Sequence, residues 1–172
     1  MPQVRLIHTL FQMHEITPLC CEVSPLSPST EVAYFIEKGH IMEYIDLGPR
    51  TSRIVALFFG PSEFVVKCHP LSTLVTLDNV KGNPFTHGQV LNILRKFPET
   101  RHHYQGIRQT YNEKVAARQL SLTIMSEKAR FEDMVKRQPW ILKLAKSNDI
   151  AAYLNISTSL LSAFINNSKQ NN

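Results

Sequence analysis

The chain changes its hydrophobic period once, near Thr86, and this change limits the folds that it can adopt. Before Thr86, short β-branched and aromatic runs are broken by Gly39, Gly48-Pro49 and Gly60-Pro61, as is typical of strands joined by tight turns. After Thr86, apolar residues recur at spacings of three or four, as is typical of helices. The sequence therefore predicts an α+β protein, in which an antiparallel β-barrel or jelly roll precedes a set of helices.

Three segments follow from this pattern. We expect a β domain at 1–98, with a short helix that Pro98 ends. A long connecting helix should follow at 99–126, and a helical domain at 127–172. Within the first segment, the apolar runs predict strands near 32–37, 40–45, 52–59, 64–67 and 72–79.

The long helix carries an apolar stripe that is longer than one small domain needs. Its members recur every three or four residues: Tyr104, Ile107, Tyr111, Val115, Arg118 and Leu122. We predict that the stripe packs on a second copy of the chain, so that residues 101–125 join a homodimer. The alternative is a helix that lies on its own barrel.

The charge is divided between the two halves of the chain. Residues 1–100 hold 8 basic and 9 acidic side chains, whereas residues 101–147 hold 10 basic and 4 acidic ones. A basic second module favours a polyanionic partner. An ordinary solvated helix face would have the same composition.

Several classes of protein are not favoured. At 43% hydrophobic residues the chain can bury a core, and no run reaches the ~18 apolar residues of a membrane span. The early residues MPQVRLIHTLFQMHE do not resemble a secretory signal, so we predict a cytoplasmic protein. Three cysteines and scattered histidines predict neither a disulfide framework nor a metal site. No catalytic motif is present, so we expect neither an enzyme nor a cofactor.

Residues 149–166, DIAAYLNISTSLLSAFIN, have the spacing of a helix-turn-helix. Apolar Ile150 and Leu154 lie one turn apart, with small Ala151 where a second helix can approach closely. Asn155 suits a left-handed turn, and Ser157 suits the cap of the next helix. The pattern predicts a unit that reads DNA, with a packed helical hairpin as the alternative.

A resemblance to a known family adds to this reading. The segment ARFEDMVKRQPWILKLAKSNDIAAYLNISTSLLS is similar to the Bacteroidetes-type branch of the Crp/Fnr transcription regulators. YFIEKGHIMEYI and RIVALFFGPSEFV resemble barrel strands of that family, and the likeness covers most of 31–165. It implies a cyclic-nucleotide-binding-like barrel, a dimerisation helix and a terminal DNA reader.

The likeness is degenerate at the effector cassette. Members that bind cyclic nucleotides carry a Gly-Glu pair followed by an arginine, whereas here Pro61 follows Gly60 and Glu63 is displaced. Lys67 is the only cation at 60–80, and a lysine lacks the bidentate fork of an arginine. We expect no binding of cyclic AMP. An unidentified small molecule, or no ligand, would take its place.

The likeness also departs at the reader helix, expected at 157–167. Where the family has the arginines of "SRIR", this chain has Ala163 and Ile165. Leu160 and Ile165 also stand where exposed polar residues are usual, so they could instead cover a protein partner. Because the reader helix lacks these arginines, positive charge for DNA would come from Lys136 and Arg137 and from the lysines named in the next sentence. The predicted DNA-binding residues are Lys143, Lys146, Thr158, Ser159, Ser162, Asn166 and Lys169.

Three hypotheses remain open at this point. The first is a dimeric, DNA-binding regulator with a degenerate effector barrel. The second is a relative that does not bind DNA and whose helix-turn-helix is a protein interface. The third is a small-molecule-binding barrel whose rear helices serve only for dimerisation.

Overall fold

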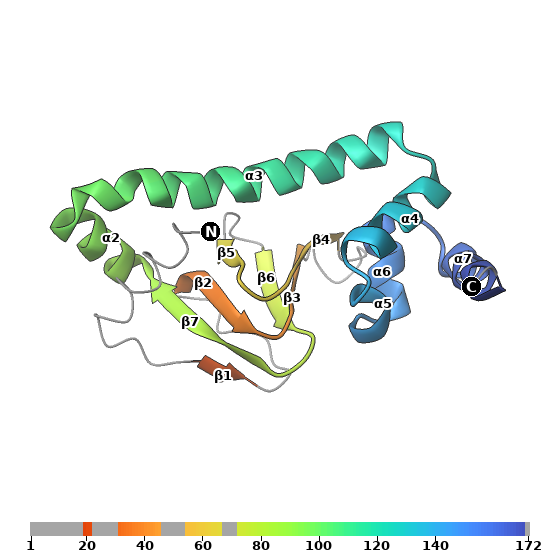
Figure 1. The fold of residues 1–172 in the computed structure, drawn as a ribbon, viewed down its shortest axis with the longest axis horizontal. Coiled ribbons are helices and arrows are strands. Elements are labelled where there is room, and N and C mark those ends of the chain that lie inside the picture. Colours follow the sequence, from red (N-terminus) through yellow and green to blue (C-terminus); the bar gives the residue numbers. More distant parts are fainter. Residues whose placement is uncertain (1–18, 22–30, 46–53, 67–71, 171–172) are drawn as a thin grey trace.

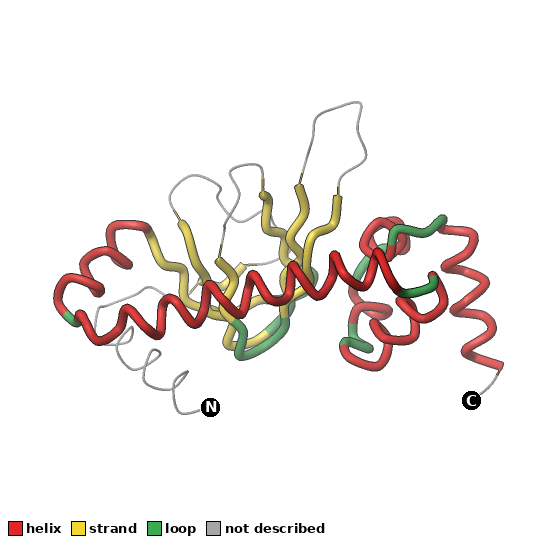
Figure 2. Tube along the Cα trace, turned by 90° about the horizontal axis from the view of Figure 1, so that it is seen from above, coloured by secondary structure: helices red, strands yellow, loops and turns green. Residues whose placement is uncertain are grey.

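One long helix, α3 (Arg101–Ile124), connects the two parts of the molecule. The structure is a computed structural model that describes residues 19–21, 31–45, 54–66 and 72–170. Figure 1 shows β-sheets under the middle of α3 and a group of helices beneath and beyond its far end. Seen from above in Figure 2, α3 crosses the strands and the helical group lies to one side of them.

The described strands form two antiparallel sheets, in the orders β1-β7-β2-β5 and β4-β3-β6. The sequence predicted an antiparallel barrel or jelly roll. The antiparallel sheets are confirmed, but the described strands do not close, so among them the barrel form is wrong. A pair of packed sheets takes its place. The strands are β1 (Leu19–Cys21), β2 (Glu31–Lys38), β3 (Ile41–Ile45), β4 (Ile54–Phe59), β5 (Phe64–Val66), β6 (Ser72–Thr76) and β7 (Val80–Thr86).

The first core cluster links the two sheets to α3. Tyr34 and Ile36 contribute from β2, and Phe59 contributes from β4. Tyr111 of α3 is buried in this cluster, and Val115 packs against it. Because alternate residues of a strand face opposite sides, this inner cluster uses one half of each strand.

The other half of each strand serves two further clusters. Phe35 and Phe85 pack with Val90 of α2 (His87–Lys96), and Tyr104 and Ile107 of α3 pack against them. On the second sheet, Met42, Val55 and Phe58 share a core with the C-terminal helices. Both sheets are therefore covered on their outer faces, and the helical group is anchored to β3 and β4.

The predicted helices are confirmed with small shifts of their ends. The helix ended by Pro98 is α2, and a single 3-10 turn, η1 (Pro98–Thr100), leads into α3. The side chain of Ser126 accepts from the Ala129 N–H and caps the next helix, as the sequence indicates. The C-terminal helices are α4 (Glu127–Arg137), α5 (Ile141–Leu144), α6 (Ser147–Leu154) and α7 (Thr158–Gln170).

Strand β7 is the main element that the sequence did not predict. The expected run at 72–79 contains β6 alone, and β7 begins at Val80. No helix of the described residues is long and apolar enough to cross a membrane.

Candidate functional site

Helices α6 and α7 are joined by a tight left-handed turn. Asn155 has φ 51° and ψ 54°, the left-handed conformation predicted for it. The Ile156 N–H donates to the Ala151 carbonyl at 3.0 Å, and the Ser157 Oγ accepts from the Leu160 N–H at 3.2 Å. These bonds satisfy backbone groups at both helix ends and fix the angle between the helices.

The side chain of Arg130 connects α4 to the turn between α6 and α7. Its Nε donates to the Leu154 carbonyl at 2.9 Å, its Nη1 to Met125 at 2.8 Å and its Nη2 to Asn155 at 3.4 Å. Arg130 as a whole is 9% exposed. This role could not be predicted from the sequence, because an arginine in a helix is usually a solvated surface residue.

Helix α7 presents a polar face that lacks positive charge in its described part. Leu161 is fully buried and Phe164 packs against the same core, so the opposite side of α7 faces solvent. Ser162 donates its hydroxyl to the Thr158 carbonyl at 2.9 Å. The exposed residues include Thr158, Ser159, Ser162, Ala163 and Asn166, which agrees with the predicted outer face.

The expectation that Leu160 and Ile165 stand exposed is wrong. Both are half-buried, and Ile165 packs against the core of the helical group. Ile165 is therefore part of the fold of α7.

The candidate cations lie before α7 in the chain. Lys136 and Arg137 end α4, Lys143 is in α5, and Lys146 directly precedes α6. All four are exposed, and Arg137 is paired with Asp133 at 2.8 Å. Lys169 lies on α7, but its side chain is outside the described ones.

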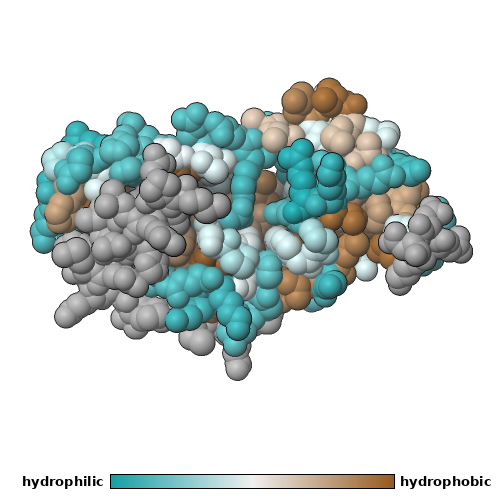
Figure 3. All heavy atoms as spheres, viewed as in Figure 1, coloured by the Kyte–Doolittle hydropathy of each residue, from teal (hydrophilic) through white to brown (hydrophobic). Residues whose placement is uncertain are grey.

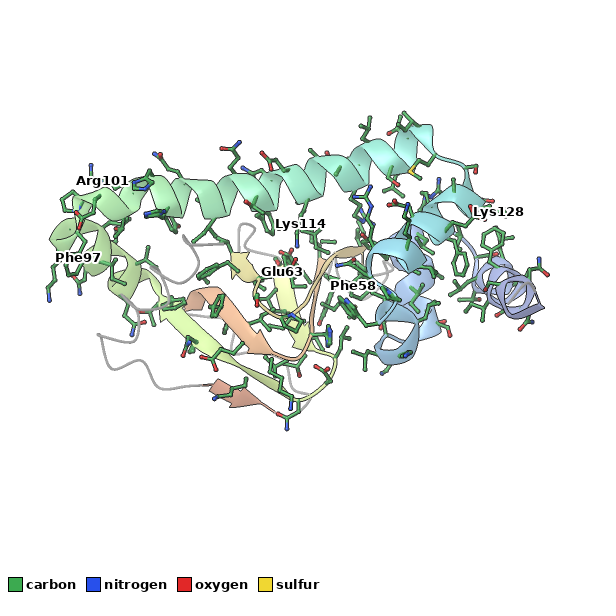
Figure 4. All side chains as sticks on the ribbon, in the orientation of Figure 1. Phe58, Glu63, Phe97, Arg101, Lys114 and Lys128 are labelled. Carbon is green, nitrogen blue, oxygen red and sulfur yellow. The ribbon has the colours of Figure 1, made fainter. Side chains whose placement is uncertain are left out.

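The displaced residues of the effector cassette, Gly60 and Glu63, lie in one turn and are hydrogen-bonded to each other. Glu63 accepts from the Gly60 N–H at 2.9 Å and pairs with Lys114 of α3 at 2.5 Å. Figure 4 shows Glu63 and Lys114 approaching each other under α3. Ser62 holds this turn with φ 67°. Lys67, the remaining cassette residue, lies outside the described residues.

The space between the sheets is filled by the protein's own side chains. Tyr111 stacks with Phe59 at 6.3 Å between ring centroids, and its hydroxyl donates to the two oxygens of Glu43 at 3.0 and 2.9 Å. Ser72 also donates to Glu43, which is 1% exposed. This buried polar group was not found from the sequence, since Glu43 stands in an ordinary strand pattern.

The predicted dimer stripe of α3 faces the chain's own sheets. Tyr104 and Ile107 pack on the cluster around Phe85, and Tyr111 and Val115 join the core between the sheets. The interpretation of this stripe as a contact with a second copy is wrong, and the alternative of a helix on its own sheets holds for these residues.

The opposite face of α3 has its own regular spacing. Six exposed residues recur at intervals that alternate between four and three, the spacing of a coiled-coil seam. In Figure 3 hydrophobic side chains gather on the surface near the α4 end of α3, and Leu120 and Ile124 there are 57% and 68% exposed. We call this face the outer seam: Gly106, Thr110, Glu113, Ala117, Leu120 and Ile124.

Comparisons with known proteins give matches to structures alone. No model of a known protein family matches the chain, and no curated protein does. The matched structures share the arrangement of two sheets, a connecting helix and a terminal helical group.

The particular fold is that of the Crp/Fnr regulators. FixK2 from Bradyrhizobium japonicum superposes with a TM-score of 0.75 at 12% identity, over 91% of this chain and 85% of that one. A protein from Eubacterium rectale assigned to the Crp/Fnr transcriptional regulators gives 0.72 at 8% identity, over 95% and 82%. CLP of Xanthomonas campestris, described as a c-di-GMP-responsive global regulator, gives 0.69 at 9% identity, over 96% and 92%. Two of these three proteins are thus described as regulators.

Proposed function

We propose that the chain is a dimeric, DNA-binding transcription regulator of Crp/Fnr type. The observation that carries the proposal is the α6–turn–α7 unit, whose left-handed Asn155 and capping Ser157 leave a polar helix face open to solvent. The shared fold supports the same function. DNA is the polyanion that such a unit, next to a basic segment, would bind.

The chemistry of the side chains indicates which residues would contact phosphates and which would contact bases. Lys143 and Lys146 contact phosphates, because they are exposed and make no salt bridge with another described residue. Thr158, Ser159, Ser162 and Asn166 supply directional hydrogen bonds, and the Asn166 amide suits adenine. Since no described side chain of the exposed α7 face is charged, the basic residues upstream carry the salt-dependent part of the affinity.

The sheet domain does not use cyclic nucleotides in this proposal. Glu63 is engaged by its own turn and by Lys114, and Tyr111 and Phe59 occupy the space under α3. The protein is a homodimer through the outer seam of α3. Leu120 and Ile124 are large apolar side chains that a second copy would cover.

A salt-titrated mobility shift with pooled genomic fragments tests the proposal. We expect a reproducible subset of fragments to be retained as the salt concentration rises, because base contacts survive when phosphate contacts are screened. Retention of all fragments alike would contradict sequence-specific binding.

A second function is favoured by the uncharged face of α7, which would also suit a protein partner. Ala163→Arg separates the two, since Ala163 is exposed and the change adds one phosphate contact without disturbing the core. If the wild type binds no DNA even at ~50 mM salt while Ala163→Arg does, α7 has lost its DNA role and the interaction module is correct. Ile165→Arg is unsuitable for this test, because Ile165 is half-buried and packs against the core of the helical group.

A further inference from the structure

A cleft of about 420 Å³ lies where the sheets, α3 and the helical group meet. Leu57 and Phe58 of β4 form one wall, and residues of α4 and α6 form another. The last three turns of α3 form the roof. Figure 4 shows Lys114 and Glu63 on the sheet side of this region and Phe58 next to the helical group. The volume is within the range of sites for small organic ligands, about 300–1,000 Å³.

The cleft carries more positive than negative charge. Its charged lining residues are four cations and two carboxylates: Lys114, Arg118, Arg130, Arg137, Glu63 and Asp133. Lys114 is paired with Glu63, and Arg137 with Asp133. Arg130 donates to three backbone carbonyls. Among the described residues, Arg118 is the cation of this lining that pairs with no carboxylate, and a single backbone carbonyl accepts from it.

Arg118 is held in place, but its guanidinium does not have a hydrogen-bond partner for each of its nitrogens. Its Nη2 donates to the Tyr153 carbonyl at 3.1 Å, and its guanidinium lies 5.1 Å from the centre of the Tyr153 ring. Its Nε is buried and has no hydrogen-bond partner among the described residues. Burial lowers the pKa of Arg118, and the Tyr153 hydroxyl acts in the opposite direction. A buried donor without a partner is costly, and an anion that reached it would remove that cost.

We propose that this cleft binds a small organic anion, with a carboxylate or phosphate head on Arg118 and an apolar body against the wall. A guanidinium presents two parallel N–H donors to such a head, which an ammonium group does not. Phe58, Leu122 and Met134 supply the apolar lining. The site differs from the filled space between the sheets, where Tyr111 and Phe59 lie.

The position of the cleft gives the ligand a regulatory effect. Arg118 is on α3, and its partner Tyr153 is on α6, one residue before Leu154 and the turn at Asn155. A bound anion would therefore set the position of α6 and α7 relative to α3. This regulatory effect rests on the proposed DNA-binding function, whereas the binding of the anion does not.

Thermal unfolding of the DNA-free protein with three probes tests the binding. Benzoate and phenyl phosphate carry the two heads, and benzamide is the neutral counterpart of benzoate. We expect at least one anion to raise the Tm saturably, by about 3 °C at ten times its dissociation constant, and benzamide to leave it unchanged. A larger shift with one anion than with the other identifies the head as carboxylate or phosphate.

Two variants assign the effect to Arg118. Arg118→Met keeps the length of the side chain and should abolish the anion-dependent shift. Arg108→Met, an exposed position on the same helix, should keep it. Circular dichroism checks that both variants are folded. If Arg118→Met does not fold, Arg118→Lys replaces it and should weaken the apparent affinity at least tenfold, because the charge remains without the fork.

Three results would overturn the proposal. The first is that neither anion raises the Tm saturably. The second is that the Arg118 variant shows the same anion-dependent rise in Tm as the wild type. The third is that anion binding disappears as the protein dimerises. The last result would mean that the partner protomer fills the cleft, which opens next to Leu120 and Ile124. Because no DNA is present, a failure of the DNA-binding proposal would leave these results unaffected.

Discussion

The carboxylate of Glu43 accepts hydrogen bonds from Tyr111 and Ser72 inside the sheet domain, at 1% exposure. A buried carboxylate is stable only when donors replace the water that it has lost. Since Tyr111 belongs to α3 and Glu43 to β3, their bond also fixes the rotation of α3 over the sheets. One phenol thus has both a packing role and a polar role.

Removal of the Tyr111 hydroxyl should destabilise the fold. We expect Tyr111→Phe to lower the free energy of unfolding by about 1–3 kcal/mol, because Glu43 stays buried with fewer donors. Urea denaturation measures the change. Tyr104→Phe is the matched control, since Tyr104 lies on the same stripe without a side-chain hydrogen bond to a described residue. Equal stability of the two variants would contradict the role of the hydroxyl.

The engagement of Glu63 leads to a prediction about ligands. Calorimetry should detect no binding of cyclic AMP or cyclic GMP at micromolar concentrations. Glu63 would have to leave the Gly60 N–H and Lys114, and Tyr111 and Phe59 would have to move to make room. Saturable micromolar binding of either nucleotide would show that this region rearranges.

Among the elements, helices were predictable where local signals define them. The caps at Ser126 and Ser157 and the left-handed turn at Asn155 depend on neighbouring residues alone, so sequence spacing locates them. Strand β7, in contrast, is not defined by local signals. Its Gly82-Asn83-Pro84 segment has low strand propensity, and only pairing with β2 and β1 makes it extended. Pro84 is tolerated because the described pairing of β1 reaches only from Val80 to Gly82.

The stripe of α3 shows a second limit of sequence reasoning. A 3.6-residue period identifies the buried face of a helix, but it does not identify what covers that face. For Tyr104, Ile107 and Tyr111 the cover is the chain's own sheets. The cleft around Arg118 was likewise unpredictable, because its walls come from β4, α3, α4 and α6 and meet only in the fold.

The helical group leads to a prediction about salt dependence. Lys143→Ala and Lys146→Ala should each weaken the binding of all DNA sequences alike and reduce the slope of log K against log salt by about 0.9. Asn166→Ala should change the preferred sequence more than the total affinity, since an amide gives directional bonds without charge. Mobility shifts at stepped salt measure both effects.

Lys96→Ala is the control for these variants. Lys96 is exposed at the end of α2, which lies at the opposite end of α3 from α7. Its slope should equal that of the wild type. If Lys143→Ala and Lys146→Ala also leave the slope unchanged, the phosphate contacts lie elsewhere.

At the scale of the whole molecule, α3 has two faces with different partners. The inner stripe holds the two sheets and the outer seam is left for a second copy. Leu120→Glu should therefore yield a folded monomer by light scattering, because a charge on the seam opposes burial without touching the core. Gln119→Glu is the control, since Gln119 is exposed and is not part of the seam, so the dimer should stay intact. Ile107→Glu should instead lower the Tm, because Ile107 packs on the cluster around Phe85. A dimer in Leu120→Glu, or a stable monomer in Ile107→Glu, would mean that these two faces of α3 are assigned the wrong way round.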